Sequence, residues 1–305
     1  MTQGPDFIII GAAKAGTTAI WNWLNAHPQV FMPRVKEPSF FSFQNTEVIP
    51  KNGPFDPSYS KRITTNCSDY GALFQPSKGQ ICGEASPIYL QTSDAAQNIH
   101  QYNSKIKLIA ILRDPANRAF SQFSHNLREG YETTYSFFKA LSLEKKRRQA
   151  GWLKFFDYLE GGRYGKQLQA YYKRFDRNQI LVLKFEDLNA DPAAAFNKIC
   201  SFLDIESTVK ISLTKKFNVS SSLKKAPRIQ LLKRMSNQPN VLKTVLKSML
   251  PKGIRNLIKD KIEQINQRDT QQMTSEEAET IYKELTADRV LLRKLTAMNF
   301  VTWGE

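Results

Sequence analysis

Residues 7–28 of the chain read FIIIGAAKAGTTAIWNWLNAHP, and this stretch decides the fold. Its first four residues, 7–10, are apolar and predict a short buried strand. Small residues and one lysine follow, and Thr17 and Thr18 then open an amphipathic helix. A strand, a small-residue loop and a helix N-terminus favour a bound phosphate, because the loop amides converge and the helix dipole attracts negative charge. An α/β fold with a phosphate-binding loop is therefore expected.

The spacing within this loop argues against a triphosphate site. A nucleoside-triphosphatase loop reads G-x-x-x-x-G-K-[ST]. Gly11, Gly16 and Thr18 keep that spacing, but Thr17 stands in the lysine position and Lys14 lies inside the loop. An ammonium at that place reaches atoms attached to a 5′-phosphate but is poorly placed to follow a triphosphate chain. We expect a donor without a γ-phosphate; the alternative is a small-residue turn that only packs tightly.

Length and composition are those of a globular chain with an anionic partner. The 305 residues are 41% hydrophobic and 11% aromatic, which argues against disorder and allows one large α/β domain or two small ones. Lysine and arginine number 44 against 28 aspartate and glutamate residues, a net charge of +16. The partner is therefore expected to be a polyphosphorylated small molecule, an acidic polymer or a membrane surface.

The cysteines and the first residues indicate a compartment. Cys67, Cys82 and Cys200 have no metal-ligand spacing and form no paired framework, which suits a reducing environment. The opening residues MTQGPDF lack the pattern of a signal peptide, and no segment approaches about 18 uninterrupted apolar residues. A cytoplasmic protein that needs no metal is expected.

The segment 30–43, VFMPRVKEPSFFSF, places an acidic residue among aromatic ones. Its two prolines interrupt it too often for a long helix. Glu37 lies close to Phe40 and Phe41, and partial desolvation there would raise the pKa of its carboxyl and suit a general base. The alternative is an exposed loop glutamate paired with Lys36. The local sequence leaves both open.

Residues 105–130, KIKLIAILRDPANRAFSQFSHNLREG, predict a second buried strand followed by a helix. The continuous apolar run is typical of a central parallel strand, and the proline after it begins the helix. Arg113 stands at the carboxyl end of that strand, where open α/β sheets bind ligands, and Ser121 and His125 share one helix face. Arg113 with a helix serine makes a second candidate anion site. The alternatives are a salt bridge between Arg113 and Asp114 and an ordinary surface or capping role for His125.

The remaining chain predicts further elements of an α/β fold. We expect a surface loop over 44–79 with a short helix near 70–74. Strands are expected within 81–90 and at 179–188. Helices are expected at 94–103, at 164–175, after Pro192 and, as the last helix, at 274–296. The run KKRR at 145–148 is expected to be a solvated helix face. Lys224, Lys225 and Arg228 form a third candidate anion site, because a loop of donors can close over a phosphate. Residues 229–266 are expected to form a helical lid on the sheet; the alternative is a helix on a membrane surface.

As a set, these stretches resemble the sulfotransferases that use 3′-phosphoadenosine-5′-phosphosulfate (PAPS). The resemblance runs from Phe7 to Trp303 and is carried by GAAKAGTT, KEPSFF, RDPANRAFS after its strand, LVLKFEDL with its DP helix, and NVSSSLKK. Bacterial members and the heparan sulfate N- and 3-O-sulfotransferase domains are the most similar. The resemblance implies one domain over 1–305, a three-layer α/β/α fold with a central, mainly parallel sheet, and a basic helical C-terminal lid.

The same resemblance implies roles for the candidate residues. Glu37 would be the catalytic base, Lys14 would contact the oxygen between phosphate and sulfate, and His125 would lie in the acceptor cleft. The 5′-phosphosulfate would be bound by the loop residues Ala12, Ala13, Lys14, Ala15, Gly16, Thr17 and Thr18. The 3′-phosphate would be held by Arg113, Ser121, Lys224, Lys225 and Arg228. The resemblance also shows a departure: relatives often carry a lysine where this chain has Ala85, so one charge contact on the acceptor side or in the transition state is expected to be missing.

Three functions follow from these patterns. The expected one is metal-free, in-line transfer of the sulfonate from PAPS to a hydroxyl or amino group of a small metabolite or carbohydrate, which leaves adenosine 3′,5′-bisphosphate (PAP). A nucleotide kinase or triphosphatase with a degenerate loop is disfavoured by Thr17 and by the Arg-Asp-Pro ending of the second strand. A non-catalytic binder of acidic polymers or membranes rests on the net charge alone. No nucleic-acid partner is expected.

Overall fold

The computed structural model of the protein describes residues 4–209, 211–213, 225–227, 267–269, 272–300 and 303–304. Its main sheet has five strands in the order β2-β3-β1-β4-β5, and every neighbouring pair is parallel. The strands are β1 (Phe7–Gly11), β2 (Val30–Phe31), β3 (Ile81–Ala85), β4 (Lys107–Leu112) and β5 (Ile180–Lys184). A separate antiparallel pair joins β6 (Lys225–Pro227) to β7 (Gln267–Asp269). The predicted central parallel sheet is confirmed.

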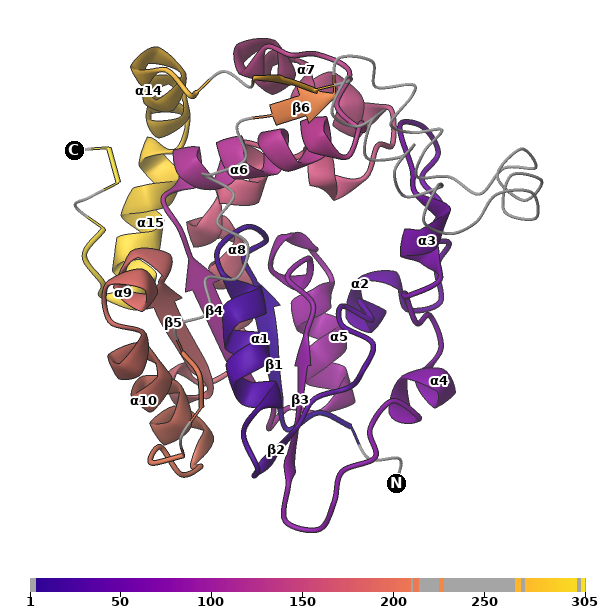
Figure 1. The fold of residues 1–305 in the computed structure, drawn as a ribbon, viewed down its shortest axis with the longest axis vertical. Coiled ribbons are helices and arrows are strands. Elements are labelled where there is room, and N and C mark those ends of the chain that lie inside the picture. The colour runs from indigo at the N-terminus through magenta and orange to yellow at the C-terminus, as the bar shows by residue number, and fades with distance from the viewer. Residues whose placement is uncertain are drawn as a thin grey trace.

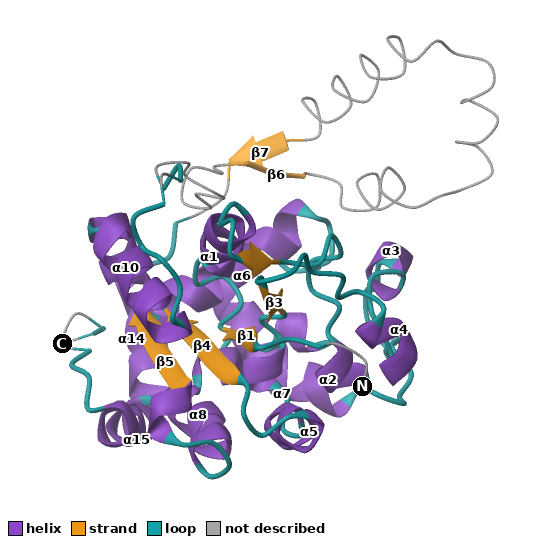
Figure 2. Ribbon diagram, turned by 90° about the horizontal axis from the view of Figure 1, so that it is seen from below, coloured by secondary structure: helices purple, strands orange, loops and turns teal. Residues whose placement is uncertain are grey.

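Helices fill the connections, because parallel strands need a crossover between them. The longer helices are α1 (Thr17–Asn25), α5 (Ala95–Tyr102), α6 (Pro115–Arg128), α7 (Phe137–Gln149), α8 (Tyr164–Tyr172), α10 (Pro192–Leu203), α14 (Ser275–Glu284) and α15 (Thr286–Thr296). The short ones are α2 (Phe40–Phe43), α3 (Pro57–Ser60), α4 (Cys67–Gly71) and α9 (Phe185–Ala190), with 3-10 turns η1 (Tyr89–Gln91), η2 (Lys154–Phe156), η3 (Glu160–Gly162) and η4 (Arg177–Gln179). Figure 2 shows α1 and α10 on one face of the sheet and α5, α8 and α15 on the other. Within the described ranges, no helix is both long and apolar enough to cross a bilayer.

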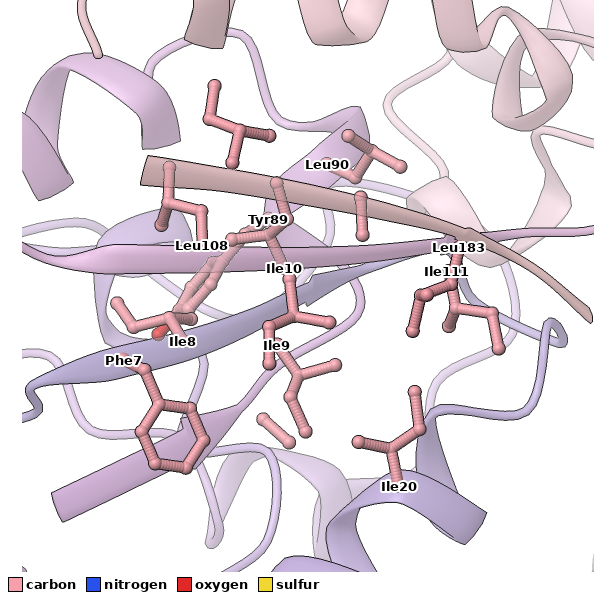
Figure 3. Close-up of a cluster of buried hydrophobic side chains, with 14 of the residues drawn as sticks. Phe7, Ile8, Ile9, Ile10, Ile20, Tyr89, Leu90, Leu108, Ile111 and Leu183 are labelled. Carbon is pink, nitrogen blue, oxygen red and sulfur yellow. The ribbon is translucent and has the colours of Figure 1, made fainter. Parts of the chain in front are cut away.

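The core is centred on β1, which lies between β3 and β4. Phe7, Ile8, Ile9 and Ile10 are fully buried, since helices cover both faces of the strand. Figure 3 shows Ile20 of α1 beside this cluster, pointing from the helix layer towards the sheet. Burial of each such side chain stabilises the fold by about 1.5–3 kcal/mol. The continuous apolar run in the sequence therefore marks a strand that is buried on both faces.

The carboxyl ends of β1 and β4 meet at one edge of the sheet, and α6 lies across this edge (Figure 1). The loop after β1 is tied to β4 there, because the Ala12 amide donates to the Ile111 carbonyl at 2.7 Å. Arg113 and then α6 follow directly from β4. The topology alone thus brings the small-residue loop, the strand-end arginine and α6 to one edge, which is where parallel sheets bind ligands.

Two predicted boundaries are wrong. β5 ends at Lys184, and the last residues of the predicted strand belong to α9. Glu186 and Asp187 lie in the first turn of α9, where the helix dipole favours acidic side chains. The predicted last helix is split into α14 and α15, which meet at the fully buried Leu285.

The predicted surface loop over 44–79 is partly wrong, because it also contains α3; the predicted short helix near 70–74 overlaps α4, which begins three residues earlier. Each of these helices begins at a capping side chain, Asp56 or Asn66, that accepts a hydrogen bond from a backbone amide of the first turn. Each contributes one buried tyrosine, Tyr59 or Tyr70. A one-turn helix with a single buried ring leaves no periodic pattern in a sequence, so the usual helix signal was missing for α3.

The run KKRR on α7 is only partly the solvated face that was predicted, because Arg147 is buried. Its guanidinium donates to both carboxylate oxygens of Glu132, at 2.6 and 2.7 Å, and stacks on the Trp152 ring at 4.8 Å. Lys146 and Arg148 beside it are exposed, as expected. A two-pronged ion pair therefore joins α7 to the loop that precedes it.

Removal of this buried cation is expected to destabilise the protein. Arg147→Met leaves the Glu132 carboxylate buried without its partner, and breaking a buried pair in this way costs about 3–5 kcal/mol of unfolding free energy. Lys146→Met removes the same charge from the exposed neighbour and should change stability by no more than about 0.5 kcal/mol. Urea unfolding of the two variants measures the difference. Equal, small effects would show that the ion pair contributes little.

Candidate active site

The loop between β1 and α1 turns sharply because three of its residues adopt left-handed backbone angles. The φ angles are 151° at Gly11, 69° at Lys14 and 95° at Gly16. A Cβ atom on Gly16 would lie 2.9 Å from the Phe185 ring, so the position needs glycine for space as well as for conformation. In the first turn of α1 the Ala19 amide donates to the Gly16 carbonyl at 2.9 Å. The Thr17 and Thr18 amides have no acceptor within their own helix and face the position of an anion at its N-terminus.

Lys14 carries an ammonium that is largely withdrawn from water. Burial lowers its pKa to about 8, and the positive charges of Arg128 and Arg113 add to the effect, while Glu37 and Glu129 oppose it. No described carboxylate forms a salt bridge with this ammonium. A buried cation in such a position is stabilised when an anion binds beside it. Lys14 therefore fits a site for a negatively charged ligand.

Arg113 lies next to this loop, at the end of β4. Its Nη1 atom donates to the Lys14 carbonyl oxygen at 3.1 Å, and its guanidinium stacks on the Phe185 ring at 4.7 Å. The Tyr164 hydroxyl donates to the Arg113 carbonyl oxygen at 2.9 Å. These contacts fix the guanidinium at the carboxyl edge of the sheet, where burial lowers its pKa.

The alternative for Arg113, a salt bridge with Asp114, is wrong for the part of the chain that the structure describes. Asp114 instead caps α6, since its carboxylate accepts a hydrogen bond from the Asn117 amide at 2.8 Å. It also accepts from the Tyr282 hydroxyl at 2.9 Å, which ties α14 to α6. The carboxylate is committed to fold contacts, so the arginine remains available to a ligand.

Ser121 and His125 lie on α6, one turn apart, as predicted. Ser121 is buried and His125 is partly buried. The His125 Nδ1 atom accepts a hydrogen bond from Arg128 Nη2 at 2.6 Å. Burial first, and then the charges of Lys14 and Arg128, lower the pKa of His125 to about 3. The ring is therefore neutral with its proton on Nε2, which makes it a hydrogen-bond donor and unsuited to act as a general base.

Glu37 lies in the turn between β2 and α2, with a left-handed φ angle of 62°. Its Oε1 atom accepts from Lys36 Nζ at 2.9 Å, so the predicted pairing with Lys36 exists. The same Nζ atom donates to the Thr18 hydroxyl on α1 at 2.9 Å. The carboxylate thus lies close to the phosphate loop, and Glu37 also acts electrostatically on Lys14. The pairing named in the second alternative is present, with a half-buried carboxylate, and the role of Glu37 as a general base stays a prediction.

Glu84 is a site residue that the sequence analysis did not single out. It is 1% exposed on β3, and no described cation pairs with it. Its carboxylate accepts hydrogen bonds from three hydroxyls, those of Tyr70 at 2.9 Å, Tyr89 at 3.0 Å, and Ser86. Burial raises its pKa to about 7, partly offset by these hydrogen bonds. An acidic residue inside an otherwise apolar strand was the one available signal.

The Glu84 network supports the turn that carries the candidate base. The Ser86 hydroxyl, which donates to Glu84, accepts from the Ser39 amide at 2.9 Å. The Ser39 hydroxyl in turn donates to the Glu37 carbonyl oxygen at 3.2 Å. The buried carboxylate therefore fixes the left-handed turn at residues 37–39 through two serines.

Glu84 is also expected to give stability a measurable pH dependence. Its folded-state pKa of about 7 lies above the ordinary value of 4.5, so folding favours the protonated form. The stabilisation is complete below about pH 4.5 and is lost as the pH rises towards 7. The difference in unfolding free energy between the wild type and Glu84→Gln should therefore fall over that interval. Urea unfolding at several pH values tests this, with the exposed-site variant Glu47→Gln as control; a difference that does not vary with pH would contradict it.

Several predicted site residues are placed only partly or not at all. Lys224 and Arg228, and the predicted lid at 229–266, lie outside the described residues. The backbone of Lys225 belongs to β6, which lies against α6 (Figure 1). Ala85 is buried at the carboxyl end of β3. The described residues hold no group of three or more His, Cys, Asp and Glu side chains able to bind a metal.

Comparisons with known proteins find similar sequences and a similar fold. A family model described as a sulfotransferase domain matches residues 4–288. The heparan sulfate glucosamine 3-O-sulfotransferase 3B1 of Mus musculus is 31% identical over 206 residues, which are 67% of this chain and 47% of that protein. The bifunctional heparan sulfate N-deacetylase/N-sulfotransferase 2 of Homo sapiens is 26% identical over 216 residues, 70% of this chain and 23% of that protein. The chain thus spans about half the length of the first relative and less of the second.

A solved structure shares the whole fold. The sulfotransferase from Alicyclobacillus acidocaldarius superposes with a TM-score of 0.77 at 24% identity and covers 99% of this chain and 100% of that one. The likeness shows that the arrangement of the sheet and its helices is a known one.

Proposed function

The chain belongs to the sulfotransferase family, and from that premise we propose that it transfers a sulfonate group from PAPS to a hydroxyl or amino group of a small metabolite or carbohydrate. One observation carries the proposal: the partly buried ammonium of Lys14, unpaired with any described carboxylate, lies in a loop that ends at the N-terminus of α1. Ammonium, loop amides and helix dipole all favour the same anionic group. The residues present therefore fit the phosphosulfate end of PAPS.

In this proposal the chain holds the donor at both ends. The loop from Ala12 to Thr18 binds the 5′-phosphosulfate, while Arg113 and Ser121 bind the 3′-phosphate. Lys224, Lys225 and Arg228 belong to the same proposal as further contacts to the 3′-phosphate. The support is the hydrogen bond from the Arg113 guanidinium to the Lys14 carbonyl oxygen, which holds the Arg113 side chain against the loop. Two fixed anchors orient the sulfur for in-line attack.

The bound donor supplies a sulfonate joined to a stable leaving group, and the chain's residues move the proton and balance the charge. Glu37 accepts the proton of the attacking hydroxyl or amine as the new bond to sulfur forms. Lys14 and the first-turn amides of α1 stabilise the negative charge that gathers on the departing oxygen when the bond from sulfur to that oxygen breaks. His125, with its proton on Nε2, donates a hydrogen bond to a sulfonate or acceptor oxygen.

The rival enzyme class fits less well. A kinase or triphosphatase needs an acidic side chain at the end of a second strand to hold magnesium. At the end of β4 the acidic residue is Asp114, whose carboxylate is bonded to the Asn117 amide and the Tyr282 hydroxyl. These two hydrogen bonds engage the Asp114 carboxylate in holding α6 and α14, so it is poorly placed to bind magnesium beside a nucleotide.

The proposal also covers the cellular compartment of the protein and the kind of acceptor molecule. Cys67, Cys82 and Cys200 are all free thiols, which suits a reducing environment and the cytoplasmic location that we propose. The named substrates of the two relatives are heparan sulfate chains. A smaller sugar or metabolite in the cytoplasm offers the same hydroxyl and amino groups.

The test is transfer of labelled sulfur. The protein is incubated with sulfur-35-labelled PAPS and fractionated extract of the source cell, and labelled products are separated and identified. We expect label in a product that forms only with active protein, and retention of the protein on immobilised PAP. Magnesium-dependent ATP hydrolysis without retention on PAP would favour the rival enzyme. Salt-dependent binding to heparin or anionic vesicles, with no transfer at all, would favour a non-catalytic binder.

A further inference from the structure

One ammonium group, that of Lys36, connects the proposed base to the proposed phosphate loop. Its Nζ atom donates to Glu37 Oε1 and to Thr18 Oγ1, each at 2.9 Å. Thr18 is the second residue of α1, directly after the loop. Lys36 therefore reaches the N-terminus of α1, where the proposed function places the 5′-phosphosulfate of PAPS.

The pairing of Lys36 with Glu37 can be exchanged for another partner. The two side chains are 26% and 32% exposed, and ion pairs at such exposure contribute little to stability. An ammonium has three donor hydrogens, of which Glu37 and Thr18 use two. A phosphate carries more charge than a carboxylate and accepts stronger hydrogen bonds. A donor molecule in the loop would therefore compete with Glu37 for this cation.

The pairing also restrains Glu37. While Lys36 Nζ donates to Glu37 Oε1, that carboxylate oxygen is occupied by a hydrogen bond. The turn itself is fixed by the serines that connect it to Glu84, so the contact between Glu37 and Lys36 is released only if the Lys36 side chain moves away.

Resting on the proposed function, we propose that Lys36 is a further cation of the donor site. Binding of PAPS moves its ammonium from the Glu37 carboxylate to the oxygens of the 5′-phosphosulfate, and no covalent bond changes in this step. Glu37 is then free to take the acceptor's proton only when the donor is in place. The arrangement couples activation of the base to occupancy of the donor site.

The test compares two nucleotides that differ at the 5′ end. Lys36→Met keeps the side-chain length and removes the charge. Its affinity for PAP should fall about 10- to 100-fold, the value of a lost charge-assisted contact. Its affinity for adenosine 3′-monophosphate, which lacks the 5′-phosphate, should equal that of the wild type. Titration calorimetry measures both, and the second nucleotide shows that the variant is folded.

A matched control separates a specific contact from a general loss of charge. Arg34 is exposed on the same segment, so Arg34→Met removes one positive charge without touching Thr18. It should bind PAP like the wild type. If Lys36→Met binds PAP as tightly as the wild type, the inference is overturned while the proposed function stands. If the wild type itself fails to bind PAP, the proposed function fails first.

A double-variant cycle tests the exchange itself. Glu37→Gln removes the competitor for Lys36, so PAP should bind up to about fivefold more tightly to this variant than to the wild type. In the Lys36→Met background the same substitution should give a smaller gain, because no ammonium is left to release. An equal gain in both backgrounds would overturn the exchange.

Discussion

Glu37→Gln is expected to abolish sulfonate transfer while PAP still binds. The substitution keeps the size and the hydrogen-bonding carbonyl of the side chain but removes its ability to accept a proton. General-base assistance of this kind contributes about 10²–10⁴ to the rate. The measurement is kcat with labelled PAPS at saturating acceptor, using the acceptor found in the labelling experiment, together with PAP affinity by calorimetry.

Two features of the site sharpen this prediction. His125 cannot replace Glu37 as the base, because Arg128 donates to its Nδ1 atom and its proton stays on Nε2. The control is Glu47→Gln, an exposed glutamate ten residues later, which should retain normal turnover. A Glu37→Gln variant with near-normal kcat would show that the proton is taken by another group.

Lys14→Ala and Arg113→Ala are expected to damage different steps. Lys14 acts on charge that develops during transfer, so its removal should lower kcat by about 10²–10³. Arg113 acts on a 3′-phosphate that is present before and during the reaction, so its removal should weaken donor binding with little change in kcat at saturating PAPS. Kinetics at varied PAPS concentration separate the two effects.

A pair of nucleotides checks the Arg113 assignment independently. Arg113→Ala should bind PAP about 10- to 100-fold more weakly than the wild type but bind adenosine 5′-monophosphate, which lacks the 3′-phosphate, equally well. Equal losses of kcat and of donor affinity in both the Lys14 and the Arg113 variants would contradict the division of roles.

The main sheet could be predicted from the sequence because its central strands are buried on both faces. Ile8 and Ile109, in β1 and β4, belong to continuous apolar runs that have few other interpretations. The end of β5 could not be predicted, since Phe185 packs against the glycine of the phosphate loop and that contact is invisible in the local sequence. The end of a strand or helix that is set by a tertiary contact cannot be predicted from the periodicity of apolar residues.

The candidate site also has residues that could be predicted from the local sequence and residues that could not. Lys14 and Arg113 follow from a loop pattern and a strand end, so the sequence places them correctly relative to their elements. The role of Glu84 depends on hydroxyls from Tyr70 and Tyr89, which come from two other segments of the chain. The buried pairing of Arg147 likewise depends on a glutamate 15 residues earlier, beyond any helix spacing. Partners that meet only after folding cannot be read from one strand or helix.

The most direct test of the central claim is a crystal structure of the protein with bound PAP. We expect the 5′-phosphate within hydrogen-bond distance of Lys14 Nζ and of the first-turn amides at Thr17 and Thr18, with the 3′-phosphate beside Arg113. An empty loop after a PAP soak, or magnesium and ATP filling that loop with the γ-phosphate placed for transfer, would contradict the account and every role derived from it.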